Sequence, residues 1–118
     1  MKLHRKKLLR NILVNLISNA IKYSPENSTI KIHCSDDAGD LHISVTDQGI
    51  GISEEDQQHL FERFYRAGNT GNVQGTGLGL HIVGRYISLM GGAITIKSRL
   101  NEGTTIALLI PQNKEYIE

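Results

Sequence analysis

The apolar residues of this 118-residue chain change their spacing along its length, and that change restricts the folds it can adopt. Near the N-terminus they recur at three- and four-residue steps, which predicts an amphipathic helix from about Leu3 to Tyr23. The apolar stripe consists of Leu9, Ile12, Leu13, Leu16, Ile17 and Ala20. Ser24-Pro25-Glu26-Asn27 ends the helix, because proline pushes the residue before it out of helical space.

Alternation with a period of two follows and predicts a hairpin. Ile30, Ile32 and Cys34 mark one side of a half-buried strand, residues 36–40 read as a turn, and residues 41–46 form the second strand. Ser53 caps a short helix with acids in its first turn. His33 and His42 fall on the outward faces of the two strands.

The C-terminal part repeats this order of helix and hairpin. An amphipathic helix is expected from Leu78 to Met90, closed by Gly91-Gly92, with strands at 94–97 and 105–110. A turn at 101–103 joins these strands, and Pro111 stops the last one. About four strands and three helices, with the helices on one face, predict an α+β fold in two layers.

Length and composition exclude several classes of protein. One domain over residues 1–118 is expected, with a formal net charge of +1 that argues against a nucleic-acid partner. No apolar run approaches the roughly 20 residues that span a bilayer, so direct membrane insertion is not expected. The single cysteine, Cys34, fits a reduced cytoplasmic setting, and the five histidines lack metal-ligand spacing.

A glycine-rich run, Gly75-Thr76-Gly77-Leu78-Gly79-Leu80, leads directly into the second amphipathic helix. Glycine lets the backbone approach a ligand closely, and a helix N-terminus presents free N–H groups that suit phosphate. Such turns are common, so the run gains meaning from three upstream motifs. Residues 67–79 are polar and glycine-rich, which predicts a mobile lid.

The first upstream motif, Asn15-Leu16-Ile17-Ser18-Asn19-Ala20, places two amides one helical turn apart at the edge of the buried face. Hydrated Mg²⁺ bearing phosphates is a good partner for them, since Mg²⁺ binds few protein oxygens. Lys22 continues the strip and could meet phosphate as a point charge. A solvated polar edge is the alternative interpretation.

The second motif is Asp47-Gln48-Gly49-Ile50-Gly51. A carboxylate at a strand end could accept a hydrogen bond from the exocyclic amine of a purine. Gly49 and Gly51 would let the ring lie against bare backbone, with Ile50 and Ile52 as apolar walls. An ordinary Asp/Gly turn is the alternative.

The third motif is Phe61-Glu62-Arg63-Phe64-Tyr65-Arg66. Its two phenylalanines fit core anchors or a hinge for the loop that follows. An arginine near a transferring phosphoryl group would stabilise charge in the transition state, although Arg63 and Arg66 also fit plain surface positions. The Walker phosphate loop, Rossmann spacing and the motif set of ordinary protein kinases are all absent.

In order and spacing, these four motifs resemble the N, G1, F and G2 boxes of the catalytic ATP-binding domain of two-component sensor histidine kinases. The resemblance covers nearly the whole chain and implies the Bergerat fold, a mostly antiparallel mixed sheet shared with gyrase, MutL-type repair proteins and a heat-shock chaperone. It implies ATP and Mg²⁺ as cofactors. Its partners would be a dimerisation and phosphoacceptor histidine domain and the receiver domain of a response regulator.

The resemblance also implies roles for individual residues. Asp47 would read the adenine amine and Asn19 would hold Mg²⁺, while Asn15, Lys22 and the lid would meet the phosphates. Arg66, with Arg63, would meet the γ-phosphate or the acceptor domain. The implied nucleotide-binding residues are Asn15, Asn19, Lys22, Tyr23, Asp47, Gly49, Ile50, Gly51, Ile52, Phe64, Gly75, Thr76, Gly77, Leu78, Gly79, Leu80 and Thr104.

Two departures from the family pattern lead us to expect a fragment of a longer kinase. The phosphoacceptor segment is absent, since His81 lies inside the second helix. The strand that usually precedes the first helix is also missing, which would expose a sheet edge. Two other functions stay open: a nucleotide-sensing scaffold without phosphotransfer, and a serine kinase of the anti-sigma type.

Overall fold

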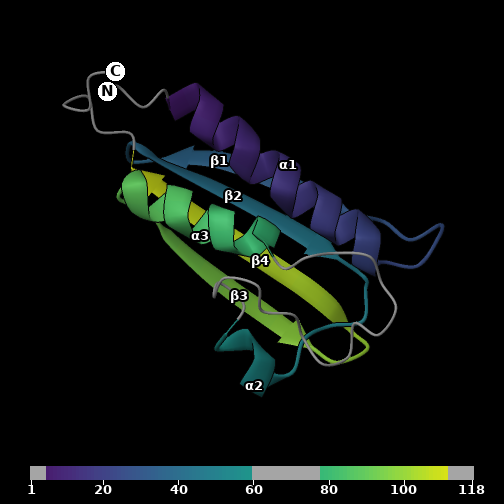
Figure 1. The fold of residues 1–118 in the computed structure, drawn as a ribbon. Helices are drawn as coiled ribbons and strands as arrows, with labels where there is room; N and C mark the ends of the chain where they lie inside the picture. The colour runs from purple at the N-terminus through teal and green to yellow at the C-terminus, as the bar shows by residue number, and fades with distance from the viewer. Residues whose placement is uncertain (1–4, 60–77, 112–118) are drawn as a thin grey trace.

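The computed structural model describes residues 5–59 and 78–111. Their elements follow the predicted order of a helix and a hairpin, twice, with a short helix between (Figure 1). They are α1 (Arg5–Tyr23), β1 (Lys31–Asp37), β2 (Asp40–Asp47), α2 (Glu54–Gln57), α3 (Leu78–Leu89), β3 (Ala93–Arg99) and β4 (Gly103–Pro111). The prediction of an α+β fold is confirmed.

The four strands form one sheet in the order β1-β2-β4-β3, and each neighbouring pair runs antiparallel. The expectation of a mostly antiparallel sheet is confirmed, and no parallel pair occurs among the described strands. The register places Asp47 of β2 opposite Thr104 of β4, and Thr104 opposite Ser98 of β3. These three residues form a row across the sheet, which we call the Asp47 row.

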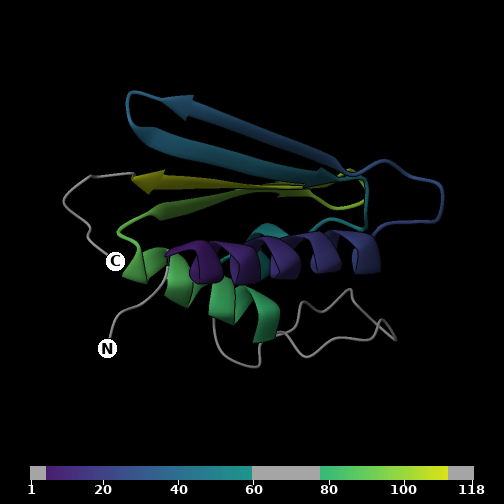
Figure 2. The same cartoon turned by 90° about the horizontal axis from the view of Figure 1, so that it is seen from above.

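The core lies between this sheet and the two long helices, which pack side by side on one face (Figure 2). Side chains every fourth residue of α1 are buried, because one face of the helix points at the sheet. Inward residues of β2 and β4 meet them from the other side. The buried apolar residues are Leu8, Ile12, Leu16, Ala20, Ile43, Val45, Val83, Ile87, Met90, Ile106, Leu108 and Ile110.

Strand β1 departs from the expectation of a half-buried strand. All seven of its residues are exposed, and Ile32 keeps 50% of its surface accessible. The alternation of Ile32 and Cys34 correctly indicated a strand, but burial also requires a covering layer. The strand is at the edge of the sheet, next to β2, whereas α1 and α3 cover the middle and the opposite edge.

Several boundaries also differ from the sequence prediction. The predicted turn at 36–40 is shorter, because β1 continues to Asp37 and β2 begins at Asp40. Only Ala38 and Gly39 remain in the turn, with φ values of 53° and 86°. Two residues with positive φ form the tight hairpin turn that matches strand twist. Pro111 is the last residue of β4 rather than the residue after it. It pairs with Asp40 at the end of the sheet, where proline is tolerated.

The predicted start of α2 at Ser53 and the predicted glycine stop of α3 are confirmed, although α3 ends at Leu89 rather than Met90. The Ser53 side chain accepts a hydrogen bond from the Asp56 amide at 3.1 Å, which is an N-cap. Helix α3 ends with the Gly92 amide donating to Ile87 O at 2.9 Å and the Gly91 amide donating to Ser88 O at 3.1 Å. This pair of bonds is a Schellman motif. No helix in the described ranges combines the length and apolar character needed to cross a membrane.

Candidate functional site

Asp47 is the last residue of β2, whereas the sequence predicted that it directly follows the strand, and its carboxylate is held from two directions. Its Oδ1 accepts hydrogen bonds from the Gly49 amide at 2.9 Å and from the Thr104 amide at 3.2 Å. Within the described part of the chain, Oδ2 has no hydrogen-bond partner. The two backbone donors therefore fix the carboxylate through Oδ1, and among the described residues nothing engages Oδ2.

Half-burial raises the pKa of Asp47 above its ordinary value, because desolvation penalises the charged form. The hydrogen bonds from Gly49 and Thr104 act in the opposite direction, since they favour the carboxylate, and they do not fully offset the burial. A partly desolvated acceptor is stronger toward a ligand than one in water. The site thus holds the Asp47 carboxylate, a strong hydrogen-bond acceptor, where burial disfavours its charged form.

The glycine loop after Asp47 lies between the end of α1 and the β3–β4 hairpin. A Cβ at Gly49 would collide with the Tyr23 carbonyl oxygen, which also accepts from the Ile50 amide at 3.3 Å. Gly51 has a φ of +73°, and a Cβ there would collide with the Arg99 carbonyl oxygen. These two positions require glycine because of close backbone approach, and at Gly51 also because of its positive φ.

The polar edge of α1 was predicted correctly in its placement. Asn15 and Asn19 are both half-buried at the margin of the core, while Lys22 is exposed. The Asn15 Nδ2 donates to Asn11 O at 2.8 Å, so the Asn15 Oδ1 remains as an acceptor. Tyr23, at the helix end, is half-buried and contacts the glycine loop through its carbonyl. Amide oxygens of this kind are suitable Mg²⁺ ligands.

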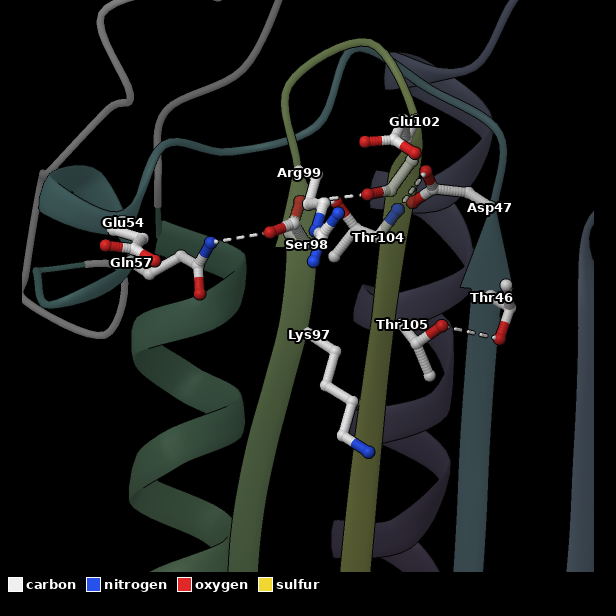
Figure 3. A pocket seen from close by; sticks show the side chains of 11 residues that line it. Thr46, Asp47, Glu54, Gln57, Lys97, Ser98, Arg99, Glu102, Thr104 and Thr105 are labelled. Atoms are coloured by element: carbon white, nitrogen blue, oxygen red, sulfur yellow. Dashed lines mark hydrogen bonds between the residues drawn. The ribbon is translucent and has the colours of Figure 1, made fainter.

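Two residues that hold the site together were not among those predicted from the sequence. Ser98 Oγ accepts from the Ile52 amide at 2.8 Å, and Gln57 Nε2 donates to Ile52 O at 2.8 Å and to Ser98 O at 3.1 Å. Figure 3 shows Gln57 reaching from α2 toward β3. The alternation of Ile94, Ile96 and Ser98 did contain a signal, since it places a serine on the core face of its strand.

A groove of about 450 Å³ opens beside the Asp47 row. Thr46, Lys97 and Thr105 line it from the sheet face opposite the helices, because they alternate with the buried residues of their strands. Of the residues predicted to bind nucleotide, the groove includes Asp47 and Thr104 but none from α1 (Figure 3). It therefore differs from the predicted site, which lies on the helix side of the sheet.

The remaining predicted residues are only partly placed. Leu78 and Gly79 begin α3, and the half-buried Leu80 packs against the core cluster. The predicted residues Arg63, Phe64, Arg66, Gly75, Thr76 and Gly77 lie outside the described residues. In the described ranges, no group of three or more His, Cys, Asp or Glu side chains could hold a metal ion.

Comparison with known proteins shows the family to which this chain belongs. Residues 4–114 match the family profile described as "Histidine kinase-, DNA gyrase B-, and HSP90-like ATPase". The chain is 41% identical over 107 residues to the sensor-like histidine kinase SenX3 of Mycolicibacterium smegmatis, covering 89% of the chain and 28% of SenX3. The chain thus spans less than a third of this relative.

Solved structures show the same likeness. The mycobacterial sensor histidine kinase MprB superposes with a TM-score of 0.84 at 30% identity, over 92% of this chain and 75% of MprB. Full-length ShkA in complex with AMPPNP superposes with a TM-score of 0.74 at 34% identity, over 88% of this chain and 21% of ShkA. Since the family profile covers nearly all of its residues, the chain belongs to the histidine kinase-, DNA gyrase B- and HSP90-like ATPases, a family that implies ATP binding.

Proposed function

We propose that this chain is the catalytic domain of a cytoplasmic histidine kinase module. It binds Mg·ATP and transfers the γ-phosphate to a histidine on a separate dimerisation and phosphoacceptor domain. A response-regulator aspartate would receive the phosphate next. The observation that carries this proposal is the Asp47 carboxylate, fixed through Oδ1 and open at Oδ2 in the described part of the chain, beside a glycine loop.

Adenine recognition follows from the chemistry of that carboxylate. The adenine amine is a donor, and an ionised carboxylate is an acceptor only. A purine ring lying on the glycine loop would meet bare backbone at Gly49 and Gly51, with Ile50 and Ile52 as apolar walls. The similar structure of full-length ShkA is a complex with AMPPNP, an ATP analogue, which supports a nucleotide ligand here.

The α1 amides fit a metal-bound triphosphate. Asn19 is half-buried, has no side-chain hydrogen bond within the described residues, and offers an amide oxygen to Mg²⁺. The metal would supply charge neutralisation on the phosphates. Asn15 and Lys22, at the same edge of α1, would bind phosphate oxygens, the latter as a point charge. Arg63 and Arg66 would stabilise the charge of the transferring group.

Asn15 favours transfer over hydrolysis. An amide cannot take a proton from water, so this position lacks a general base. Its Nδ2 is also already engaged with Asn11 O, which fixes the side chain as an acceptor. The domain would therefore position ATP and neutralise its charge, while the nucleophile comes from another domain. In isolation we expect nucleotide binding with little turnover.

Transfer in trans tests the proposal against its two alternatives. The chain is incubated with γ-labelled ATP, Mg²⁺ and a dimerisation and phosphoacceptor domain, with an acceptor His→Gln variant as the matched control. Label that depends on the acceptor histidine supports the kinase. Nucleotide binding without any labelling of the acceptor domain would instead favour a sensing scaffold, and labelling of a serine would favour the anti-sigma type of kinase.

A further inference from the structure

Ser98 is the third member of the Asp47 row and has the densest hydrogen bonding in it. Its Oγ lies 2.9 Å from Gly103 O, 2.7 Å from Thr104 Oγ1 and 2.8 Å from the Ile52 amide nitrogen. The side chain is half-buried, on the face of β3 that turns toward the core. Three partners from two separate segments therefore converge on one hydroxyl.

The direction of each bond follows from counting protons. A serine hydroxyl has one proton and two lone pairs. Gly103 O can only accept, so the Ser98 proton points at it, and the Ile52 amide fills one lone pair. The bond between Ser98 and Thr104 must then use the Thr104 proton. The Thr104 hydroxyl therefore donates its proton to Ser98 Oγ. The lone pairs of Thr104 Oγ1 remain as acceptors.

The same hydroxyl connects the two segments that hold Asp47. Ile52 belongs to the glycine loop, whose Gly49 amide donates to Asp47 Oδ1. Thr104 belongs to the hairpin and donates its amide to the same oxygen. Gln57 reinforces the connection, because its amide bridges Ile52 O and Ser98 O (Figure 3). Loop and hairpin are therefore tied to each other through β3.

We propose that Ser98, assisted by Gln57, is a positioning residue for base selection. It orients Asp47 and the Thr104 hydroxyl so that these two groups present only acceptors to the base. Facing the exocyclic group on C6 of the base, these acceptors suit the amine of adenine and repel O6 of guanine, which is itself an acceptor. The proposal rests on the proposed nucleotide function and adds a cause for its base preference.

The test compares base preference with folding. Affinities of non-hydrolysable ATP and GTP analogues are measured by calorimetry on the full chain, and Tm by circular dichroism. In Ser98→Ala the Thr104 proton is free to rotate toward the base, so the adenine-to-guanine affinity ratio should fall about 3- to 10-fold, the effect of one hydrogen bond. Ser98→Thr, which restores the hydroxyl, should recover the ratio.

Ser44→Ala is the matched control, because Ser44 is a half-buried serine on the opposite face of the same sheet. It should leave the ratio unchanged. An unchanged ratio in folded Ser98→Ala, even with a lower Tm, overturns the proposal and leaves Ser98 a purely structural residue. If Ser98→Ala does not fold, Gln57→Met decides: a smaller fall in the ratio supports the proposal, and no change overturns it.

The same measurements distinguish a failure of the positioning role from a failure of the proposed nucleotide binding. Wild-type chain that binds neither analogue contradicts the proposed function itself. Wild-type chain that prefers the ATP analogue and loses that preference in Asp47→Asn, but keeps it in Ser98→Ala and Gln57→Met, contradicts the positioning role alone.

Discussion

Asp47→Asn is the substitution whose outcome the structure determines most fully. The Gly49 and Thr104 amides both donate to Oδ1, so the asparagine keeps these bonds only if its own Oδ1 takes that position. Its NH₂ group then replaces Oδ2, the oxygen proposed to face the adenine amine. Two donors would meet, and turning the amide over would sacrifice both backbone bonds.

The expected loss is that of one hydrogen bond to a charged group, about 1.5–3 kcal/mol. This corresponds to roughly a 10- to 150-fold weaker Kd for a non-hydrolysable ATP analogue, at 1.4 kcal/mol per factor of ten. A guanine analogue, whose O6 accepts, should lose less or gain. Isothermal calorimetry on wild type and variant measures both ligands.

Stability should move in the other direction from binding. The variant keeps the two backbone bonds and removes a carboxylate whose charged form burial disfavours, so its free energy of unfolding should equal or exceed that of wild type. Urea denaturation measures this. ATP-analogue affinity equal to wild type, in a folded variant, would refute the reasoning about the adenine amine. A marked loss of stability would refute the bond assignment at Oδ1.

Other predictions concern pH, the glycine loop, the core and the metal. Because the pKa of Asp47 is raised on folding, the native chain binds the proton of this carboxyl more tightly than the unfolded chain does, and the free energy of unfolding should fall as pH rises from the ordinary Asp value through the raised pKa. Nucleotide affinity should fall as pH drops through the raised pKa. Titrations across acidic pH would show both effects. Gly51→Ala should cost more than about 1 kcal/mol in urea denaturation, and more than Gly39→Ala, since Gly39 has positive φ but nothing within 4 Å of an added Cβ. Ile110→Ala, at a fully buried position, should cost about 2–5 kcal/mol, whereas Ile32→Ala on the exposed strand β1 should stay within about 0.5 kcal/mol. Asn19→Ala should weaken binding of the ATP analogue in Mg²⁺ while leaving metal-free binding unchanged, and equal losses in both conditions would contradict a metal role.

The sequence predicted the order of elements because period and turn chemistry are local properties. The spacing of Ile12 and Leu16 was enough to predict the buried face of α1, and Ser53 at a helix start was enough to predict an N-cap. The exposure of Ile32 could not be predicted in the same way, because burial depends on which strand the helices cover. Strand order and the sense of each pairing are likewise tertiary outcomes.

In the candidate site, too, local motifs could be predicted from the sequence and long-range contacts could not. Asp47 and its glycines are adjacent in sequence, so their motif was visible, and Gly49 and Gly51 prove to be close contacts of distant backbone. Ser98 bonds to Ile52, 46 positions away along the chain, and Gln57 bonds to Ser98, 41 positions away. No local sequence pattern predicts contacts of this kind. Only the inward position of Ser98 in an otherwise apolar alternation hinted that a polar group was needed there.

Phosphotransfer in trans tests the central claim most directly. The chain, γ-labelled ATP and Mg²⁺ are mixed with a dimerisation and phosphoacceptor domain, and the label on that domain is tested for stability to acid and alkali. A histidine kinase domain predicts label that is lost in acid, kept in alkali, absent from the acceptor His→Gln variant and reduced in Asp47→Asn. Acid-stable, alkali-labile label, or none despite bound ATP, would contradict the account.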